Sequence, residues 1–172
     1  MRMARTDADS ALVLIDRVLV AAQALQDERL VGNALYQFGM VHYLREEYDR
    51  AVELYLQAIP MLSASGDSLP LSYAHNRLGN AYRRLGRIAE SHASFRESVR
   101  FMEERNDLVG AAYAHTNLGL LHWRTGEYEK ALPHYLSSLE IRRQLGDRWR
   151  TASPLNNIGI LYFNWANLVL AE

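Results

Sequence analysis

The sequence has no cysteine, few prolines and almost no net charge, and each of these shortages excludes something. Without cysteine the chain has no disulfide, no cysteine metal site and no thiol nucleophile, and it is compatible with a reducing compartment. Four prolines and ten glycines in 172 residues argue against long linkers or a loop-rich fold. A formal net charge of -1 argues against a broad nucleic-acid-binding face.

The sequence also lacks a long apolar run. No stretch approaches the roughly 18 apolar residues that a membrane-spanning helix needs. The N-terminal run at 11–15 is only five residues long and has Asp9 and Asp16 close by, which argues against a secretory signal. We therefore expect a cytoplasmic protein with no membrane partner.

What the sequence does contain is a repeat with a period of forty residues. Glycine recurs at positions 39, 79, 119 and 159, and aspartate recurs at 27, 67, 107 and 147. A small residue recurs at 11, 51, 91, 131 and 171, and it is serine at 91 and alanine elsewhere. A fixed period in this range predicts stacked supersecondary units, each packing on its neighbours.

Each unit is predicted to be a pair of helices. In residues 69–107, apolar residues recur at three- and four-residue spacings along two segments, with Gly86 after the first and Asn106-Asp107 after the second. On this register the first helix of each pair, called helix A, falls at 28–44, 69–85, 108–124 and 149–164. The second, called helix B, falls at 8–26, 48–64, 88–105 and 127–145. We predict a single array: an unpaired helix B at 8–26, repeats at 28–64, 69–105 and 108–145, and an incomplete repeat at 149–172.

The recurring glycine lies in the middle of helix A, where glycine costs about 1 kcal/mol relative to alanine. Because four helices keep it, we expect helix B to cross helix A at a point where a side chain would clash. The small residues at 51, 91, 131 and 171 are expected to be the other half of this contact.

These spacings resemble the tetratricopeptide repeat. Its pattern in helix A is present at 78–82 (LGNAY) and 118–122 (LGLLH), followed in helix B by a small residue and an aromatic. Residues 38–42 and 158–162 are similar. The forty-residue unit resembles those of kinesin light chains, spindle-orientation adaptors and bacterial peptide-sensing regulators. The resemblance implies an all-α, right-handed superhelical solenoid of antiparallel helix pairs, whose helix A faces line a groove that binds peptides or protein segments.

Charge is distributed unequally between the two helix types. Residues 31–45, 71–87, 111–125 and 151–165 contain no Asp or Glu, whereas the helix B segments carry many acids. The resemblance places helix A on the groove wall, so we predict a basic groove. The predicted groove residues are Asn33, Tyr36, Tyr43, Tyr73, Asn76, Asn80, Arg83, Arg84, Tyr113, Thr116, Trp123, Arg124 and Asn156. Asn pairs with peptide backbone, arginine with carboxylates, and Tyr and Trp supply contact area, so we expect an acidic or carboxylate-ended segment.

A purely structural interpretation of these residues stays open. Arg83, Arg84 and Arg124 lie near helix C-termini, where the helix dipole favours positive charge. Asn76 and Asn156 could instead bridge neighbouring helices. Equivalent histidines in stacked helices lie on the order of 10 Å apart, too far to share a metal, so a structural role is predicted for them.

The sequence shows no nucleophile elbow, phosphate loop or zinc motif, so we predict no enzyme, no cofactor and no metal. The leading hypothesis is a peptide- or protein-binding scaffold or adaptor, as a module of a larger bacterial protein. The alternative is self-association, head-to-tail or as a dimer, through terminal helices. The helix B at 8–26 is apolar along Leu12, Ile15, Leu19 and Ala22, and the run at 165–170 is apolar too. Neither end has the polar cap that a terminal repeat usually has.

Overall fold

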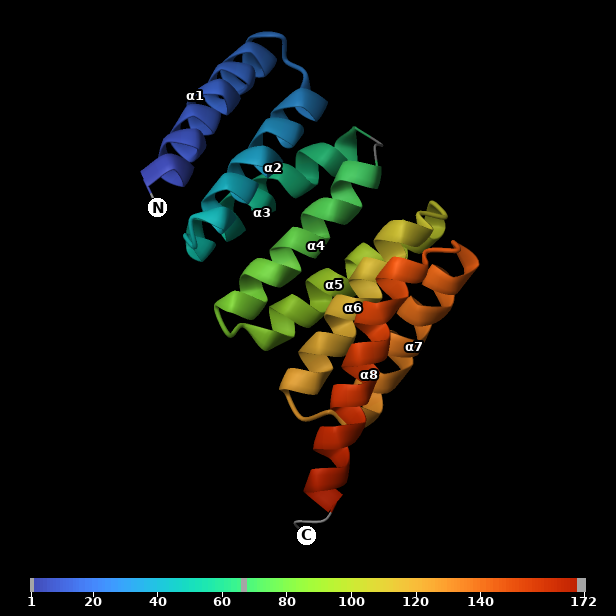
Figure 1. Cartoon of the computed structure of the whole chain (residues 1–172). Helices are drawn as coiled ribbons and strands as arrows, with labels where there is room; N and C mark the ends of the chain where they lie inside the picture. Colours follow the sequence, from blue (N-terminus) through green and yellow to red (C-terminus); the bar gives the residue numbers. More distant parts are fainter. Residues whose placement is uncertain (1, 66–67, 170–172) are drawn as a thin grey trace. The chain divides into compact units, whose positions relative to one another are not determined.

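The structure is a computed structural model that describes residues 2–65 and 68–169. Within these residues it contains eight α-helices and no strand (Figure 1). The helices are α1 (Arg2–Ala24), α2 (Glu28–Leu44), α3 (Tyr48–Ala64), α4 (Ser68–Arg84), α5 (Ile88–Glu104), α6 (Leu108–Arg124), α7 (Tyr128–Gln144) and α8 (Arg148–Val169). The bounds of α2 to α7 lie within one residue of those predicted from the sequence.

The first and last helices are longer than predicted. Helix α1 begins at Arg2 rather than at residue 8. The prediction that the last helix A ends near 164 is wrong, because α8 continues unbroken to Val169. The physical reason is that position 166 is an ordinary helical alanine, whereas the equivalent residues Glu46, Gly86 and Gly126 have positive φ and end their helices. Pro154, buried and seven residues into α8, does not delay the start of this helix.

Contacts divide the chain into two compact units, Met1–Ser94 and Phe95–Glu172, which we describe separately. In the first unit, α3 packs against both α2 and α4, and α1 packs against α2. In the second unit, α7 packs against both α6 and α8. Helices α2 and α4 also contact each other, as do α6 and α8, so in each unit two A helices form one layer. The assignment of the whole chain to a single array stays a prediction.

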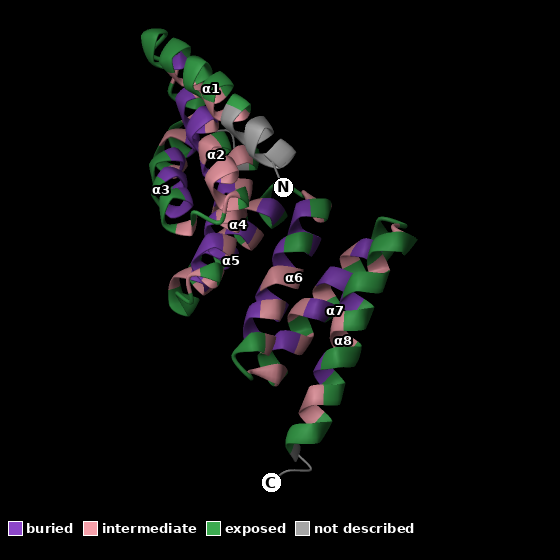
Figure 2. Ribbon diagram, turned by 60° about the vertical axis from the view of Figure 1, so that its left-hand side comes forward, coloured by how far each residue is buried: buried purple, intermediate pink, exposed green. Residues whose placement is uncertain are grey.

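The core lies between the two layers. In the first unit, Ala51, Val52 and Tyr55 of α3 meet Leu78, Ala81 and Tyr82 of α4. In the second unit, Phe95 packs on Leu118 and Leu121, while Ala131 and Tyr135 of α7 pack on Leu161 of α8. Figure 2 shows buried residues concentrated on these shared faces, with α1 exposed along much of its described length.

The recurring glycine makes room for an aromatic ring. A Cβ on Gly39 would lie 2.5 Å from the Tyr55 ring, and one on Gly119 would lie 2.6 Å from the Tyr135 ring. The close approach is therefore confirmed, but at these two sites the partner is the aromatic sixteen residues later rather than the small residue. At Gly79 the small residue does take part, because the Ser91 hydroxyl donates a 2.8 Å hydrogen bond to the Gly79 carbonyl.

Turns from helix B to helix A carry an aspartate cap. Asp27 accepts a 3.0 Å hydrogen bond from the backbone N–H of Leu30, and Asp107 accepts one of 2.9 Å from Gly110. Asp147 accepts a longer one, 3.2 Å, from the N–H of Arg150. These bonds satisfy donors that the first turn of a helix leaves without partners, which explains the spacing of the aspartates. The fourth member, Asp67, lies outside the described residues.

Turns from helix A to helix B are closed by a side-chain pair five residues apart. His42 Nδ1 donates to Glu47 Oε2 at 2.6 Å, and His122 Nδ1 donates to Glu127 Oε2 at 2.8 Å. In the turn between α4 and α5, the Arg87 guanidinium lies 4.5 Å from the centroid of the Tyr82 ring. These contacts support the structural role predicted for the equivalent histidines.

Candidate functional site

In the first unit the predicted groove residues lie on the touching helices α2 and α4. Arg84 is exposed, and the other seven are half-buried: Asn33, Tyr36, Tyr43, Tyr73, Asn76, Asn80 and Arg83. Tyr36 and Tyr43 also pack against the core, and the Tyr36 ring lies 6.0 Å from that of the buried Tyr55. Burial raises the pKa of the Tyr55 hydroxyl, so this ring stays neutral.

Helix α4 presents a chain of polar side chains one turn apart. Asn80 Nδ2 donates to the Asn76 side-chain carbonyl at 3.3 Å and to its backbone carbonyl at 3.1 Å. Arg83 Nη2 donates to Asn80 Oδ1 at 3.1 Å. The structure therefore brings Asn76, Asn80 and Arg83 together as the sequence predicted, and their contacts hold the Arg83 guanidinium in place.

Other predicted groove residues of this unit use their polar groups locally. Asn33 donates to the Arg29 carbonyl of its own helix at 3.0 Å. The Arg84 guanidinium lies 5.3 Å from the centroid of the Tyr48 ring, at the start of α3, and a hydrogen bond to Tyr48 raises the pKa of Arg84. Tyr48 in turn meets Tyr43 edge to face at 5.4 Å. Arg84 therefore lies beside the turn between α2 and α3.

In the second unit, Tyr113 is the most informative of the predicted residues. The residue is 44% exposed, and the guanidinium of Arg142, from α7, lies 4.7 Å from the centroid of its ring. Arg142 itself is only 3% exposed. The sequence did not point to this arginine, because the predicted groove residues all lie on helix A and Arg142 is on helix B.

The remaining predicted residues of the second unit divide into two groups. Thr116 and Trp123 take part in helix packing: the Thr116 hydroxyl meets the Ser138 hydroxyl at 2.8 Å, and Trp123 packs on the cluster around Tyr135. Arg124 and Asn156 are exposed on α6 and α8.

Histidines of the second unit form a cluster that the sequence did not reveal. His115 Nδ1 lies 3.2 Å from His134 Nδ1, and His115 Nε2 lies 3.2 Å from Glu103 Oε1. His134 also stacks on His122 with ring centroids 5.6 Å apart. Among the described residues, no group of three or more His, Asp or Glu side chains is placed to hold a metal ion.

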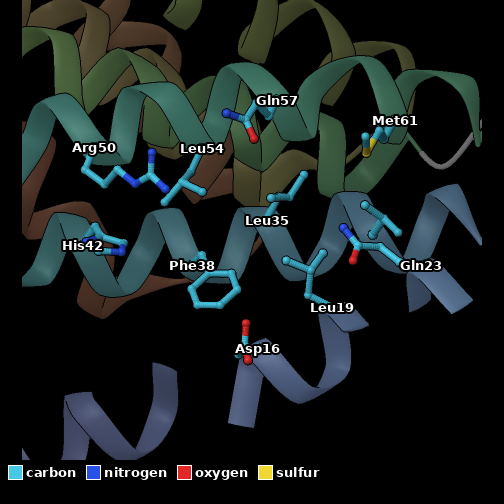
Figure 3. A pocket seen from close by; sticks show the side chains of 11 residues that line it. Asp16, Leu19, Gln23, Leu35, Phe38, His42, Arg50, Leu54, Gln57 and Met61 are labelled. Carbon is cyan, nitrogen blue, oxygen red and sulfur yellow. The ribbon is translucent and has the colours of Figure 1, made fainter. Parts of the chain in front are cut away.

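A hollow lies on the other layer of the first unit. A cavity of about 380 Å³, which we call the outer hollow, lies between α1 and α3 over a face of α2 that includes Leu35 and Phe38. Figure 3 shows the side chains that line it. A similar hollow of about 350 Å³ in the second unit is lined by Glu103, Leu118 and His134. Phe38 and Leu118 are eighty residues apart, so the two hollows occupy equivalent places in the repeat. The first is lined by six apolar and five polar side chains, with Asp16 and Arg50 among the polar ones, and sequence periodicity alone did not indicate it.

A known family matches this chain of helix pairs, with its aspartate caps and its glycine packed against an aromatic ring. The sequence profile of the tetratricopeptide repeat (TPR) matches residues 30–104 and 110–172. The chain belongs to the tetratricopeptide repeat family. This confirms the resemblance seen in the sequence.

Solved structures with the same fold include TPR proteins of several kinds. BtubC (BKLC) from P. vanneervenii is 19% identical with a TM-score of 0.86, over 94% of this chain and 67% of that protein. The apo form of RapI is 16% identical with a TM-score of 0.83, over 97% of this chain and 46% of RapI. The kinesin light chain TPR-like repeats from Podosopora anserina are 13% identical with a TM-score of 0.78, over 95% of this chain and 81% of that one. The TPR chain thus spans about half the length of RapI. At these identities the likeness shows the fold alone, and it confirms the predicted all-α class of stacked antiparallel helix pairs.

Two further findings bear on the class of protein. No curated protein matches the TPR chain in sequence. None of the helices within residues 2–65 and 68–169 is long and apolar enough to cross a bilayer. TPR folds generally serve as protein-interaction scaffolds without catalysis, and this is the function that the family membership supports.

Proposed function

We propose that this TPR chain binds a peptide or protein segment along its A helices, and that it prefers segments with acidic side chains or a free carboxyl end. The observation that carries the proposal is the Asn76–Asn80–Arg83 chain on α4, a helix that contains no Asp or Glu. The amides of Asn76 and Asn80 can pair with a peptide backbone, and a guanidinium that is already positioned loses little freedom when it pairs with a carboxylate.

The proposal is tested with the double variant Asn80→Ala/Arg83→Ala and a panel of acidic and neutral peptides. Wild type is expected to enrich acidic peptides, and the double variant is expected to lose them. A matched control, Arg50→Ala/Gln57→Ala, likewise removes one arginine and one side-chain amide, here from α3, where both are exposed at the outer hollow. Loss of binding in the control alone, or unchanged binding in the Asn80/Arg83 variant, would overturn the proposal.

A second candidate function is head-to-tail self-association. Leu14 and Val18 of α1 are 61% and 52% exposed, whereas the equivalent Leu54 and Ala58 of α3 are buried against α2. At the other end, a Cβ on Gly159 of α8 would meet nothing within 4 Å, unlike one on Gly119. We infer that α1 of one copy can pack on α8 of another, because α1 exposes apolar side chains and the face of α8 at Gly159 has open space beside it.

Self-association is checked by the molar mass in light scattering over a wide concentration range. The mass is expected to rise with concentration in wild type and to stay monomeric in Leu14→Lys/Val18→Lys. A wild-type mass that stays at the monomer value over the whole concentration range would remove this candidate. A non-enzymatic role and a cytoplasmic, bacterial setting, all expected from the sequence, stay predictions.

A further inference from the structure

Arg142 occupies a position that the other repeats fill with apolar side chains. Forty-residue steps back along helix B lead to Met102, Leu62 and Ala22, and each of these is at most 1% exposed. Arg142 is as deeply placed, at 3% exposed, but it carries a positive charge. Arginine is almost never fully buried in proteins unless it is paired.

No carboxylate accompanies this buried guanidinium in the described part of the chain. Its Nε is enclosed and has no hydrogen-bond acceptor there. Its contact is with the ring of Tyr113, whose centroid lies 4.7 Å away. Taking a charge out of water costs more free energy than one cation–π contact recovers, so the site has an electrostatic deficit that an anion would relieve.

The guanidinium lies against the α6 face where ligand binding is proposed. Ser138, one turn before Arg142 on α7, donates to the Ala112 carbonyl of α6 at 2.8 Å. The same hydroxyl meets that of Thr116 at 2.8 Å. This stripe of α7 therefore presses on residues 112–116 of α6, and Arg142 extends it to Tyr113.

The segment around Arg142 has no spare negative charge. Residues 142–150 contain four arginines and one acid, Asp147. Asp147 already pairs with Arg150 at 3.2 Å and caps the first turn of α8. An acidic ligand group arriving here meets four arginines, and the single carboxylate among these nine residues is already paired.

We propose that Arg142 is the anchor of an oxyanion subsite that takes a carboxylate of the bound acidic segment. The inference rests on the proposed function and names the residue that provides its acidic preference in the second unit. The planar guanidinium, stacked on Tyr113, offers two parallel N–H donors to the two carboxylate oxygens. Phosphate oxyanions share this chemistry, and the experiment below distinguishes the two sources.

The test compares wild type with Arg142→Met, which installs the side chain found at the equivalent Met102. Arg143→Met is the control, because it removes the same charge from an exposed neighbour. The probes are acetyl-tetra-aspartate amide, acetyl-tetra-asparagine amide, acetyl-tetra-asparagine with a free carboxyl end, and inorganic phosphate. Two quantities are measured: the thermal midpoint without probe, and the affinity from NMR titration of the arginine Nε–H resonances, among which Arg142 is identified by its loss in the variant.

Without probe, Arg142→Met is expected to raise the thermal midpoint by at least about 3 °C, because an unpaired buried charge is removed. Wild type is expected to bind the aspartate and free-carboxyl peptides with a shift of the Arg142 Nε–H, and Arg142→Met is expected to bind them at least about tenfold more weakly. Arg143→Met should keep wild-type affinity within about twofold.

Several results would overturn the inference. A lower midpoint in Arg142→Met would show that the arginine is a structural residue. Unchanged peptide affinity in Arg142→Met, while wild type binds acidic peptides, would remove the subsite but leave the proposed function standing. Wild type that binds none of the acidic probes would instead remove the acidic preference itself. If phosphate shifts the Arg142 Nε–H resonance at a lower concentration than either peptide does, the ligand of this subsite is phosphate and not a carboxylate. Should Arg142→Met fail to fold, Arg142→Lys tests the two-donor geometry, and its unchanged affinity would contradict it.

Discussion

At the scale of single residues, a positive φ angle strains a residue that carries a Cβ but does not strain glycine. Glu46 has φ of 63° at the same turn position where Gly86 and Gly126 have 75° and 77°. A residue with a Cβ pays roughly 1–2 kcal/mol in this left-handed region, whereas glycine does not. Glu46→Gly is therefore expected to raise the free energy of unfolding by about 1 kcal/mol in urea titrations. The control Glu46→Ala keeps the Cβ, so an equal gain in Glu46→Ala would show that charge, not backbone strain, is the cause.

Glu127 gives the chain a specific acid sensitivity. Hydrogen bonds from Lys130, His122 and Thr125 lower the pKa of this carboxyl from 4.5 to about 2. A carboxyl with a lowered pKa in the folded state stabilises the fold above its unfolded value of 4.5, and this contribution is lost as the pH falls through about 2.

The Glu127→Gln variant tests this sensitivity. It is expected to be less stable than wild type at pH 7, with the difference shrinking below pH 4.5 and gone below about pH 2. Urea titrations at a series of pH values measure the difference. The control is Glu129→Gln, which removes the same charge from an exposed neighbour on α7. A constant difference for Glu127→Gln at every pH would contradict the role of its charge.

At the scale of helices, the recurring glycine packs against an aromatic ring in α6 but has open space beside it in α8. A Cβ at position 119 would lie 2.6 Å from the Tyr135 ring, so Gly119→Ala is expected to lower the free energy of unfolding by roughly 1–2 kcal/mol. A Cβ at 159 meets nothing within 4 Å, so Gly159→Ala is expected to raise it by up to about 1 kcal/mol. Chemical denaturation of monomeric protein measures both. Equal destabilisation by the two variants would mean that the face of α8 at Gly159 is covered.

Helix positions were predictable because the residues that end one helix and begin the next recur with the repeat. A left-handed residue and an aspartate cap recur every forty residues, so one repeat read correctly places the others. Helix α8 exceeded its predicted end because alanine at 166 supplies no left-handed break. The sequence did not show that an aromatic ring, rather than the small residue twelve positions after the glycine, packs against Gly39 and Gly119, because both residue types recur with the same period.

The candidate site was predictable in part. Asn76, Asn80 and Arg83 lie together as expected, since residues three and four apart share a helix face. The burial of Thr116 and Trp123 depends on how α7 and α8 pack, which a helix register does not specify. Arg142 was visible in the register as the only charged residue in the series 22, 62, 102 and 142. Comparing repeats column by column would have found it.

At the scale of the whole molecule, a nearly neutral TPR chain has very few acids on its A helices, of which only α2 carries one, Glu28. The net charge is -1, yet α4, α6 and α8 contain arginines and no Asp or Glu. The acids lie mainly on the B helices, where many pair with neighbours, as Glu97 and Glu104 do with Arg100. This separation gives the two layers different surfaces although the molecule has almost no net charge.

Binding of an acidic segment by the A helices is best measured by amide NMR of the labelled protein titrated with acetyl-tetra-aspartate amide. We expect shifts to concentrate at Asn76, Asn80 and Arg83 on α4 and at Tyr113 on α6, with little change at Leu54 and Gln57 beside the outer hollow. Shifts confined to Leu54, Gln57 and the other residues of that hollow, or no saturable shift at all, would contradict it.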